Sequence, residues 1–325
     1  MRSTCRRANA LSLVLRRAQS HLGAALRPGS RRRNRAILWT FEKLAGLSLF
    51  AICVALLMVS QTPATADEAQ TKRIRIEYVP PTNPAHETVY ALLKERRALE
   101  KLQEIFSPFR LPIDLTLKAM GCDGVSNAWY HRPSVTLCYE YLDEIHRSVP
   151  EKTTPEGVTP QDAEVGQLFY VVAHEIGHAM FDYLDIPVFG RQEDAADQFS
   201  TYMMLHFGKD DALRLIKGAA YSYRNYVRNP DVTVPLQAFA DVHGAPMQRF
   251  YNLLCIAYGA DPILFEGFVA EEHLPKGRAN DCEHEYNEAR FAFRTLIVPH
   301  LDEQLAKQVL DKALHREVIA RPARN

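Results

Sequence analysis

The 325-residue sequence contains only six cysteines, and no two of them have the C-x-x-C spacing of a thiolate metal site. A zinc ion held by cysteines is therefore not expected. The sequence also has no internal repeat and no low-complexity tract. Its composition, with 47% hydrophobic and 24% charged residues, is typical of a globular protein with one large domain or two small ones.

Acidic residues are almost absent from residues 1–66, which contain 11 of the 39 Lys and Arg but only Glu42 as an acid. The net charge of zero therefore combines +10 (11 − 1) in this segment with −10 (28 − 38) in the remainder. A mature domain with an acidic balance lacks the basic surface that nucleic-acid binding needs. No nucleic-acid partner is expected.

Residues 1–66 are predicted to be a targeting region. A basic flank leads into the uncharged run 44–60, and Ala64-Thr65-Ala66 follows as an A-x-A cleavage site. This arrangement predicts a cleaved secretory signal. An uncleaved membrane anchor at 44–60 is the alternative, because a run of this length reaches the lower limit for spanning a bilayer. Contact with a membrane is expected only through this segment.

Four cysteines lie beyond the targeting region, and export would place them in an oxidising compartment. They are Cys122, Cys138, Cys255 and Cys282. We predict the disulfides Cys122–Cys138 and Cys255–Cys282, because each pair flanks one compact local unit. Four reduced, buried thiols are the alternative.

Residues 67–325 are expected to form a single α+β domain. A mixed α/β lobe, 67–150, is predicted to hold strands at 72–79 and 111–120, a helix at 85–109, a hairpin at 126–141 and a helix from about Leu142. The proline-rich loop 149–160 leads into a helical lobe, 160–325. Its helices are predicted at 161–184, 193–207, 209–227, 245–258, 277–297 and 301–318.

A His-Glu-x-x-His pattern, His174 to His178, lies within the predicted helix 161–184. Residues four apart share a helix face, so both imidazoles can bind one metal ion. Glu175 can approach the open position of that ion and accept a proton from water, whose pKa zinc lowers to about 7. Two core histidines on an amphipathic helix are the alternative. Gly177 costs the helix about 1 kcal/mol relative to Ala, which the close approach of another element or a ligand would explain.

A third protein ligand is expected after this helix. The metzincin pattern requires Gly and His at the positions of Phe181 and Leu184, so that class is excluded. Glu193 is the predicted third ligand, and Asp197, one turn later, is predicted to orient a ligand imidazole. A solvated acidic helix start is the alternative for this pair. Asp194 and Asp185 are the other candidate ligands.

The H-E-x-x-H pattern followed by E-x-x-x-D resembles the gluzincin peptidases, the thermolysin-like class. More specifically, HEIGHAMFDYLDIPVFGRQEDAADQFS is similar to a bacterial family of exported metallopeptidases. The similarity continues in NAWYHRPSVTLCYEYL, QRFYNLLCIAYGADP and LPKGRANDCEHEY, and spans about residues 75 to 300. This resemblance implies a zincin-like α+β fold, one zinc ion, a peptide or protein substrate, and a periplasmic or extracellular location.

The gluzincin resemblance also suggests residues that contact the substrate. The stretch Asn127-Ala128-Trp129-Tyr130 resembles the edge strand that pairs with the substrate backbone, and its first three residues are the expected contacts. An ordinary hairpin strand would have the same pattern. His243 is a candidate for stabilising the oxyanion, with a surface histidine as the alternative. Arg249 and Tyr251 are further candidates for that role, unless they are a solvated base and a packed aromatic residue.

The sequence therefore predicts zinc-dependent hydrolysis of peptide bonds, with His174, His178 and Glu193 as metal ligands and Glu175 as general base. One alternative is an exported zinc-binding or scaffolding module without hydrolytic activity. Another is a helical binding protein in which the metal motif arose by chance.

Overall fold

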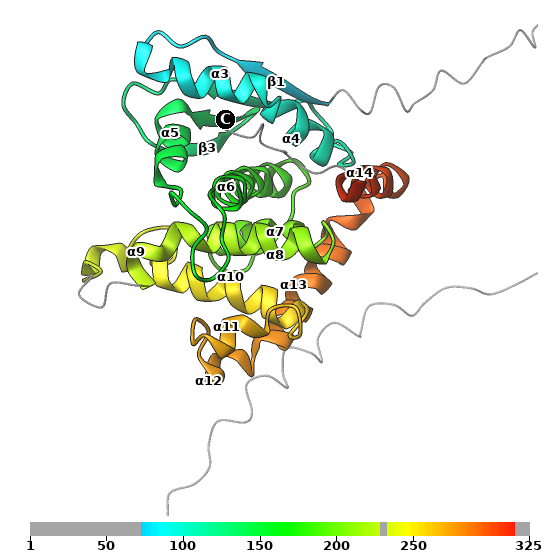
Figure 1. Ribbon diagram of the computed structural model, residues 1–325. Coiled ribbons are helices and arrows are strands. Elements are labelled where there is room, and N and C mark those ends of the chain that lie inside the picture. Colours follow the sequence, from blue (N-terminus) through cyan, green and yellow to red (C-terminus); the bar gives the residue numbers. More distant parts are fainter. Residues whose placement is uncertain (1–72, 228–232, 316–325) are drawn as a thin grey trace, which may run out of the picture. The chain divides into compact units, whose positions relative to one another are not determined.

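The computed structural model describes residues 73–227 and 233–315, which all belong to the compact unit Pro63–Asn325 (Figure 1). Residues 1–66, predicted to be a targeting region with the uncharged run 44–60, lie outside the described residues. Within the described ranges, no helix is both long enough and apolar enough to cross a bilayer. The fold class is α+β, as predicted, with a small sheet near the N-terminus of the described chain and a helical remainder.

The sheet has four strands in the order β1-β2-β4-β3. Strand β2 is parallel to both β1 and β4, whereas β3 runs antiparallel to β4 and forms one edge of the sheet. The predicted strands and the predicted hairpin are confirmed. The bounds are β1 (Ile74–Tyr78), β2 (Leu115–Met120), β3 (Ala128–His131) and β4 (Ser134–Cys138).

The helix expected at 85–109 is instead broken into two. Arg97 adopts a left-handed conformation with φ of 51°, which ends one helix and starts the next. The next helix, α5, was expected to begin near Leu142 but begins three residues earlier, at Tyr139, directly after β4. The helices of this lobe are the short 3₁₀ turn η1 (Pro84–His86), α3 (Glu87–Glu95), α4 (Ala98–Phe106) and α5 (Tyr139–Ser148).

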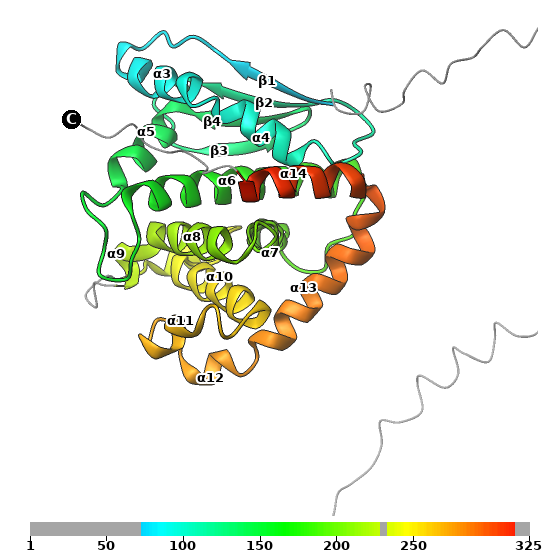
Figure 2. The same cartoon turned by 45° about the vertical axis from the view of Figure 1, so that its right-hand side comes forward.

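Helix α6 (Pro160–Tyr183) is the central element, with the sheet on one side and α7 (Gln192–Met204) and α8 (Lys209–Ala220) on the other (Figure 2). A capping box starts it, because Thr159 accepts from the Asp162 backbone N–H and the Asp162 side chain accepts from that of Thr159. Pro160 at the first helical position is compatible with this start. The loop before α6 was predicted correctly, and α6 begins within one residue of its expected position.

Gly177 allows α7 to approach α6 closely. A Cβ atom at this position would lie 3.2 Å from Cδ1 of Phe199 and 3.4 Å from Cα of Ala196. The close approach of another element, one of the two explanations considered for this glycine, is therefore present. It brings the first turn of α7 beside the motif on α6.

The remaining helices follow α8 and form further layers (Figure 2). The predicted helix at 277–297 is two helices, and one short helix, α11, was not expected. The bounds are η2 (Tyr221–Tyr223), α9 (Arg224–Val227), η3 (Leu236–Phe239), α10 (Pro246–Ala260), α11 (Glu266–Ala270), α12 (Lys276–Ala279), α13 (Cys282–Leu296), η4 (Val298–His300) and α14 (Glu303–His315).

The chain returns to the α/β lobe at its C-terminal end, where α14 lies beside α4 in both views (Figures 1 and 2). Two backbone bonds hold this junction: Arg110 N–H donates to His300 O at 2.8 Å, and Asp302 N–H donates to Pro108 O at 2.8 Å. The two lobes therefore share one continuous core.

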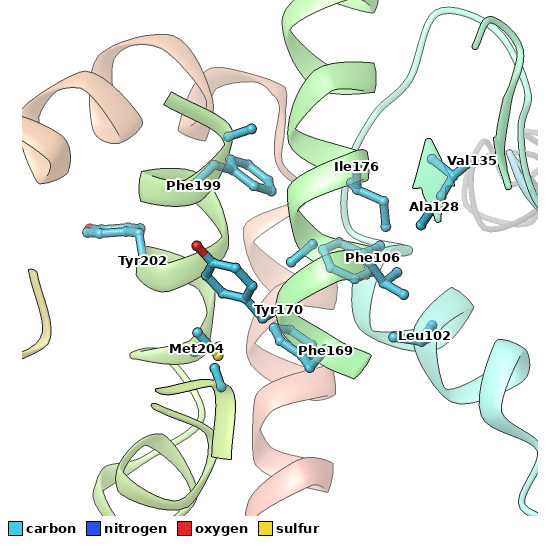
Figure 3. Close-up of a cluster of buried hydrophobic side chains, with 14 of the residues drawn as sticks. Leu102, Phe106, Ala128, Val135, Phe169, Tyr170, Ile176, Phe199, Tyr202 and Met204 are labelled. Atoms are coloured by element: carbon cyan, nitrogen blue, oxygen red, sulfur yellow. The ribbon is translucent and has the colours of Figure 1, made fainter. Parts of the chain in front are cut away.

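That core encloses α6 on two sides. Figure 3 shows Phe169 and Ile176 of α6 with Phe106 of α4 and Val135 of the sheet, while Phe199 approaches from α7. The Phe106 and Phe169 rings are stacked with centroids 5.9 Å apart. Burial on both sides fixes the rotation of α6 about its own axis, which determines where its histidines point.

Two disulfides form, and they are the predicted pairs. The Cys122–Cys138 sulfur atoms are 2.13 Å apart, and those of Cys255–Cys282 are 2.04 Å apart. The first connects the loop after β2 to the end of β4, and the second connects α10 to the start of α13. Paired cysteines are typical of proteins in an oxidising compartment.

Candidate metal centre

Three side-chain atoms from α6 and α7 converge on one point. Nε2 of His174 lies 3.1 Å from Nε2 of His178, and Oε2 of Glu193 lies 3.0 Å and 3.2 Å from these two nitrogens. Together these residues form a group that could hold a metal ion, as the sequence predicted for its three ligands. The four-residue spacing on α6 aligns the imidazoles, and the Gly177 contact brings Glu193 to them.

The spacing of these three atoms is compatible with a metal ion of the size of zinc. Bonds of about 2.0–2.1 Å from a tetrahedral zinc place its ligand atoms about 3.3 Å apart. The three observed separations of 3.0–3.2 Å lie within a few tenths of an ångström of that value. Two imidazole nitrogens and one carboxylate oxygen also form a donor set that leaves a position open, which is characteristic of catalytic zinc sites.

The outer hydrogen bonds of the two imidazoles turn their lone pairs towards this point. Nδ1 of His174 donates to the Asp197 carboxylate at 2.7 Å, and Nδ1 of His178 donates to Oε1 of Gln192 at 2.9 Å. In the neutral rings both Nε2 atoms then carry lone pairs that face each other and Glu193. A cation at the centre removes this repulsion.

A proton can take the place of the metal ion. Burial lowers the pKa of His174, but hydrogen bonds to Asp197 and Glu193 outweigh burial and raise it to about 9. The same hydrogen bond from His174 is the main reason that the pKa of Glu193 is lowered to about 2. A protonated His174 donates from Nε2 to Glu193, so a metal ion would replace this proton on binding.

Asp197 is buried behind His174 and is held by a second cation. The guanidinium of Arg249 on α10 donates to it twice, from Nε to Oδ2 and from Nη2 to Oδ1, each at 2.7 Å. Burial raises the pKa of Asp197, but His174 and Arg249 outweigh burial and keep it well below its usual value. Asp197 is therefore an ionised acceptor that fixes the tautomer and orientation of His174.

Glu175 is the next residue on α6 and does not belong to the ligand group. Its carboxylate accepts a hydrogen bond from the backbone N–H of Tyr130 on β3. Burial is the largest influence on its pKa and, although His174 and Tyr130 oppose it, raises the pKa to about 7. Its side chain is thus held between the metal-site helix and the edge strand.

The site opens into a cavity of about 730 Å³. The ligand group and Glu175 lie in its wall, together with three residues predicted to contact a substrate backbone. The lining residues predicted from the sequence are Asn127, Ala128, Trp129, His174, Glu175, His178, Glu193, His243 and Arg249.

His243 is located at the ligand group. Its Nε2 lies 3.0 Å from Oε2 of Glu193, and its Nδ1 lies 3.1 Å from Oδ1 of Asp241. The side chain is 43% exposed. An imidazole in this position is directed at the centre and also remains accessible from the cavity.

Other sequence candidates have different surroundings. Arg249 lines the cavity, but its guanidinium is bound to Asp197. Tyr251 is not among the lining residues, and its ring packs edge-on against Phe250 with centroids 5.4 Å apart. Asp194 forms an ion pair with Arg191 at 3.0 Å instead of joining the ligand group.

Several residues of the site were not predicted. Gln192 contacts His178, and the aromatic residues Tyr170 and Tyr223 line the cavity. Gln192 precedes a predicted ligand, and Tyr170 precedes His174 by one helical turn, so spacing could have suggested both. No local pattern distinguishes Tyr223, because the fold alone brings it to the site.

Comparison with models of protein families gave a match. A family model with the description "Putative metallopeptidase" matches residues 78–297, well over half of the chain, and this range contains all the ligand candidates. Searches of curated proteins and of solved structures gave no match. The extent of the family match shows that this chain belongs to that metallopeptidase family.

Proposed function

We propose that this chain is an exported, zinc-dependent peptidase of the gluzincin type. The observation that carries the proposal is the convergence of His174, His178 and Glu193, with the Glu175 carboxylate in the wall of the same cavity. Membership of a metallopeptidase family supports metal-dependent hydrolysis of peptides at the general level. One zinc ion is the metal that best suits two imidazoles and one carboxylate.

A bound zinc ion would polarise the scissile carbonyl and lower the pKa of an attacking water to about 7. Glu175 would act as general base, accepting a proton from that water and delivering it to the leaving amine. The contact with the Tyr130 backbone N–H holds its carboxylate in the cavity. Asp197 and Arg249 would act through His174, by keeping its ring oriented.

His243 would stabilise negative charge that develops on the carbonyl oxygen. Its ring is accessible from the cavity. As an imidazolium it would donate from Nδ1 to Asp241 and from Nε2, which is directed at the centre, to that oxygen. A donor in such a position contributes most when the charge forms in a water-excluded site.

The edge of β3 would bind the substrate backbone. Ala128 is paired with Leu137, while the N–H of Cys138 donates to the carbonyl of Asn127. This register makes Ala128 and Leu137 a non-hydrogen-bonded pair, so the N–H and C=O of Ala128 point away from β4. An extended peptide could add to this edge as a further strand, with Asn127 and Trp129 beside it.

Export is supported by the two disulfides and by the predicted signal within residues 1–66. Periplasmic or extracellular location follows from cleavage after Ala66, and inner-membrane attachment follows from retention of 44–60. N-terminal sequencing of the protein recovered from cell fractions distinguishes these two outcomes.

The test of function is a cleavage screen over a peptide library with the zinc-loaded protein, with Glu175→Gln as the control. We expect hydrolysis that chelators abolish, zinc binding at one ion per chain, and loss of hydrolysis with retained zinc in the variant. An active preparation in which Glu175→Gln keeps full hydrolysis would refute the mechanism. A zinc-loaded protein that cleaves no peptide would favour the zinc-binding or scaffolding module, and full zinc binding by Glu193→Ala would refute the metal site.

A further inference from the structure

An acidic residue occupies an unfavourable position at the end of α6. Asp182 lies four residues after His178, in the last turn of the helix, and that turn contains no basic residue. The helix dipole places partial negative charge at this end, so a carboxylate there destabilises the helix unless a cation compensates it.

The compensating cation comes from the turn that follows β3. Arg132 donates from Nε to Oδ2 and from Nη2 to Oδ1 of Asp182, each at 2.7 Å, and also from Nη2 to the Asp182 carbonyl at 3.2 Å. The hydroxyl of Tyr130 donates to the same carboxylate. Asp182 thus accepts from two residues of the strand region, and we refer to Tyr130, Arg132 and Asp182 as the strand clamp.

Tyr130 connects the strand clamp to the site. Its side chain binds Asp182, and its backbone N–H donates to the carboxylate of Glu175. Glu175 and Asp182 are seven residues apart on α6, which corresponds to about 10 Å along the helix axis. Helix α6 therefore holds β3 at two points, and one residue of the strand takes part in both.

The strand clamp contributes more to geometry than to stability. The side chains of Arg132 and Asp182 are 52% and 39% exposed, and ion pairs at such positions add little to the free energy of folding. A guanidinium that binds a carboxylate through two parallel bonds nevertheless fixes the relative orientation of its partners. Here the partners are the metal-site helix and the cavity edge of the sheet.

We infer that Asp182 is a positioning residue that, through Tyr130 and Arg132, sets the position of β3 over α6 and thereby the placement of Glu175 in the cavity. This inference rests on the proposed peptidase function, in which Glu175 is the general base and β3 borders the substrate. Within the strand clamp, Asp182 and Arg132 are hydrogen-bonded to neither the ligand group nor Glu175, and it is the Tyr130 backbone N–H that reaches the general base.

The experiment compares zinc-loaded wild type with Asp182→Asn, Tyr130→Phe and the control Glu77→Gln. Asp182→Asn keeps the size of the side chain but removes its charge, and Tyr130→Phe removes only the hydroxyl. Glu77 forms a partly exposed ion pair with Lys118, at 3.1 Å, between β1 and β2. Zinc content, kcat and KM, and the exchange rate of the Tyr130 backbone amide are measured for each protein.

We expect Asp182→Asn to lower kcat about tenfold or more, because a small displacement of a catalytic group is costly, with KM within about threefold. In Asp182→Asn the zinc content should stay unchanged and the Tyr130 backbone amide should exchange faster. Tyr130→Phe should lower kcat and speed this exchange in the same way. Glu77→Gln should change none of the measured quantities. Unchanged exchange of the Tyr130 amide in Asp182→Asn would overturn the inference. Faster exchange throughout the sheet together with zinc loss would also overturn it, since that result indicates a structural role only.

The amide exchange rate also separates this inference from the proposed function. If the wild-type protein binds zinc but cleaves no peptide, the peptidase proposal fails, and exchange at Tyr130 still decides whether Asp182 holds the strand.

Discussion

Replacing Asp197 by Asn should weaken the metal site and the fold together. The Asp197 carboxylate accepts three charge-assisted hydrogen bonds, one from His174 and two from Arg249, each at 2.7 Å. An asparagine of the same size accepts through one oxygen only, and its amide group would face an N–H donor. The change therefore removes the partner of a largely buried guanidinium and releases the imidazole of a ligand.

The magnitude of both effects follows from these contacts. Removing one member of a buried ion pair costs about 3–5 kcal/mol. In a domain of this size, about 2–4 °C of Tm corresponds to 1 kcal/mol, so Tm of the metal-free protein should fall by about 6–20 °C. Loss of a carboxylate that orients a ligand imidazole should also reduce zinc affinity about 10- to 100-fold.

The assay combines thermal unfolding of the metal-free protein with competition for zinc against a chelator of known affinity. Asp194→Asn is the matched control, because this acid lies one turn earlier on α7 and pairs with Arg191 at the surface. It should change Tm by about 2 °C or less, as surface substitutions do. If Asp197→Asn keeps its zinc affinity within twofold and its Tm within 2 °C of wild type, the described role of Asp197 is wrong.

Three further substitutions test separate parts of the structure. Gly177→Ala should weaken zinc binding in the same competition assay, because a Cβ atom 3.2 Å from Phe199 would displace α7 and with it Glu193. Overpacking that costs about 1–3 kcal/mol of folding free energy would offset the gain in helix propensity. His243→Ala should lower kcat about 10²- to 10³-fold with unchanged zinc content, and an unchanged kcat would exclude a role for this ring in the transition state. Burial raises the pKa of Glu164, but hydrogen bonds from Arg96 and His146 outweigh burial and lower it. A carboxyl group whose pKa is lowered on folding stabilises the fold above its unfolded pKa of about 4.3 and loses this contribution as the pH falls. Between pH 5 and pH 3 the Tm of Glu164→Gln should therefore decrease less than the Tm of the wild type. An equal decrease in both proteins would contradict the stabilising role of the ionised Glu164 carboxylate.

The local parts of the fold could be predicted because each has a local physical cause. The strand at 74–78 alternates, and the proline-rich loop before Pro160 ends at a capping box, so β1 and the start of α6 were close to their predicted positions. The break at Arg97 was missed, because a single residue in the left-handed region carries no signal in an otherwise continuous apolar pattern.

The site could be predicted as far as it depends on helical spacing. His174 and His178 share a face of α6, and Glu193 follows after a short break in the helical pattern. The three residues of the ligand group could therefore be predicted from the sequence. Contacts of Tyr130 with Glu175 and Asp182 depend on the register of β3 and the rotation of α6, which only the packed core determines. Arg249 was predicted at the site, but its partner Asp197 could not be inferred from residues 52 positions apart.

The pairing of the chain at 108–110 with 300–302 bears on how this protein folds as it is synthesised. Arg110 donates to the carbonyl of Pro299, 189 positions later, and Phe109, 2% exposed, pairs with Leu301. At about 5–20 residues per second, the partner segment is translated roughly 10–40 s after Arg110. During that interval the contacts of Phe109 and Arg110 with Leu301 and Pro299 cannot form, so the α/β lobe cannot reach its final packing while the chain is still emerging. Helices α6 and α7, which carry the metal ligands, are synthesised in between. The metal centre is therefore expected to assemble late, after the segments 108–110 and 300–302 have paired, and not to nucleate folding.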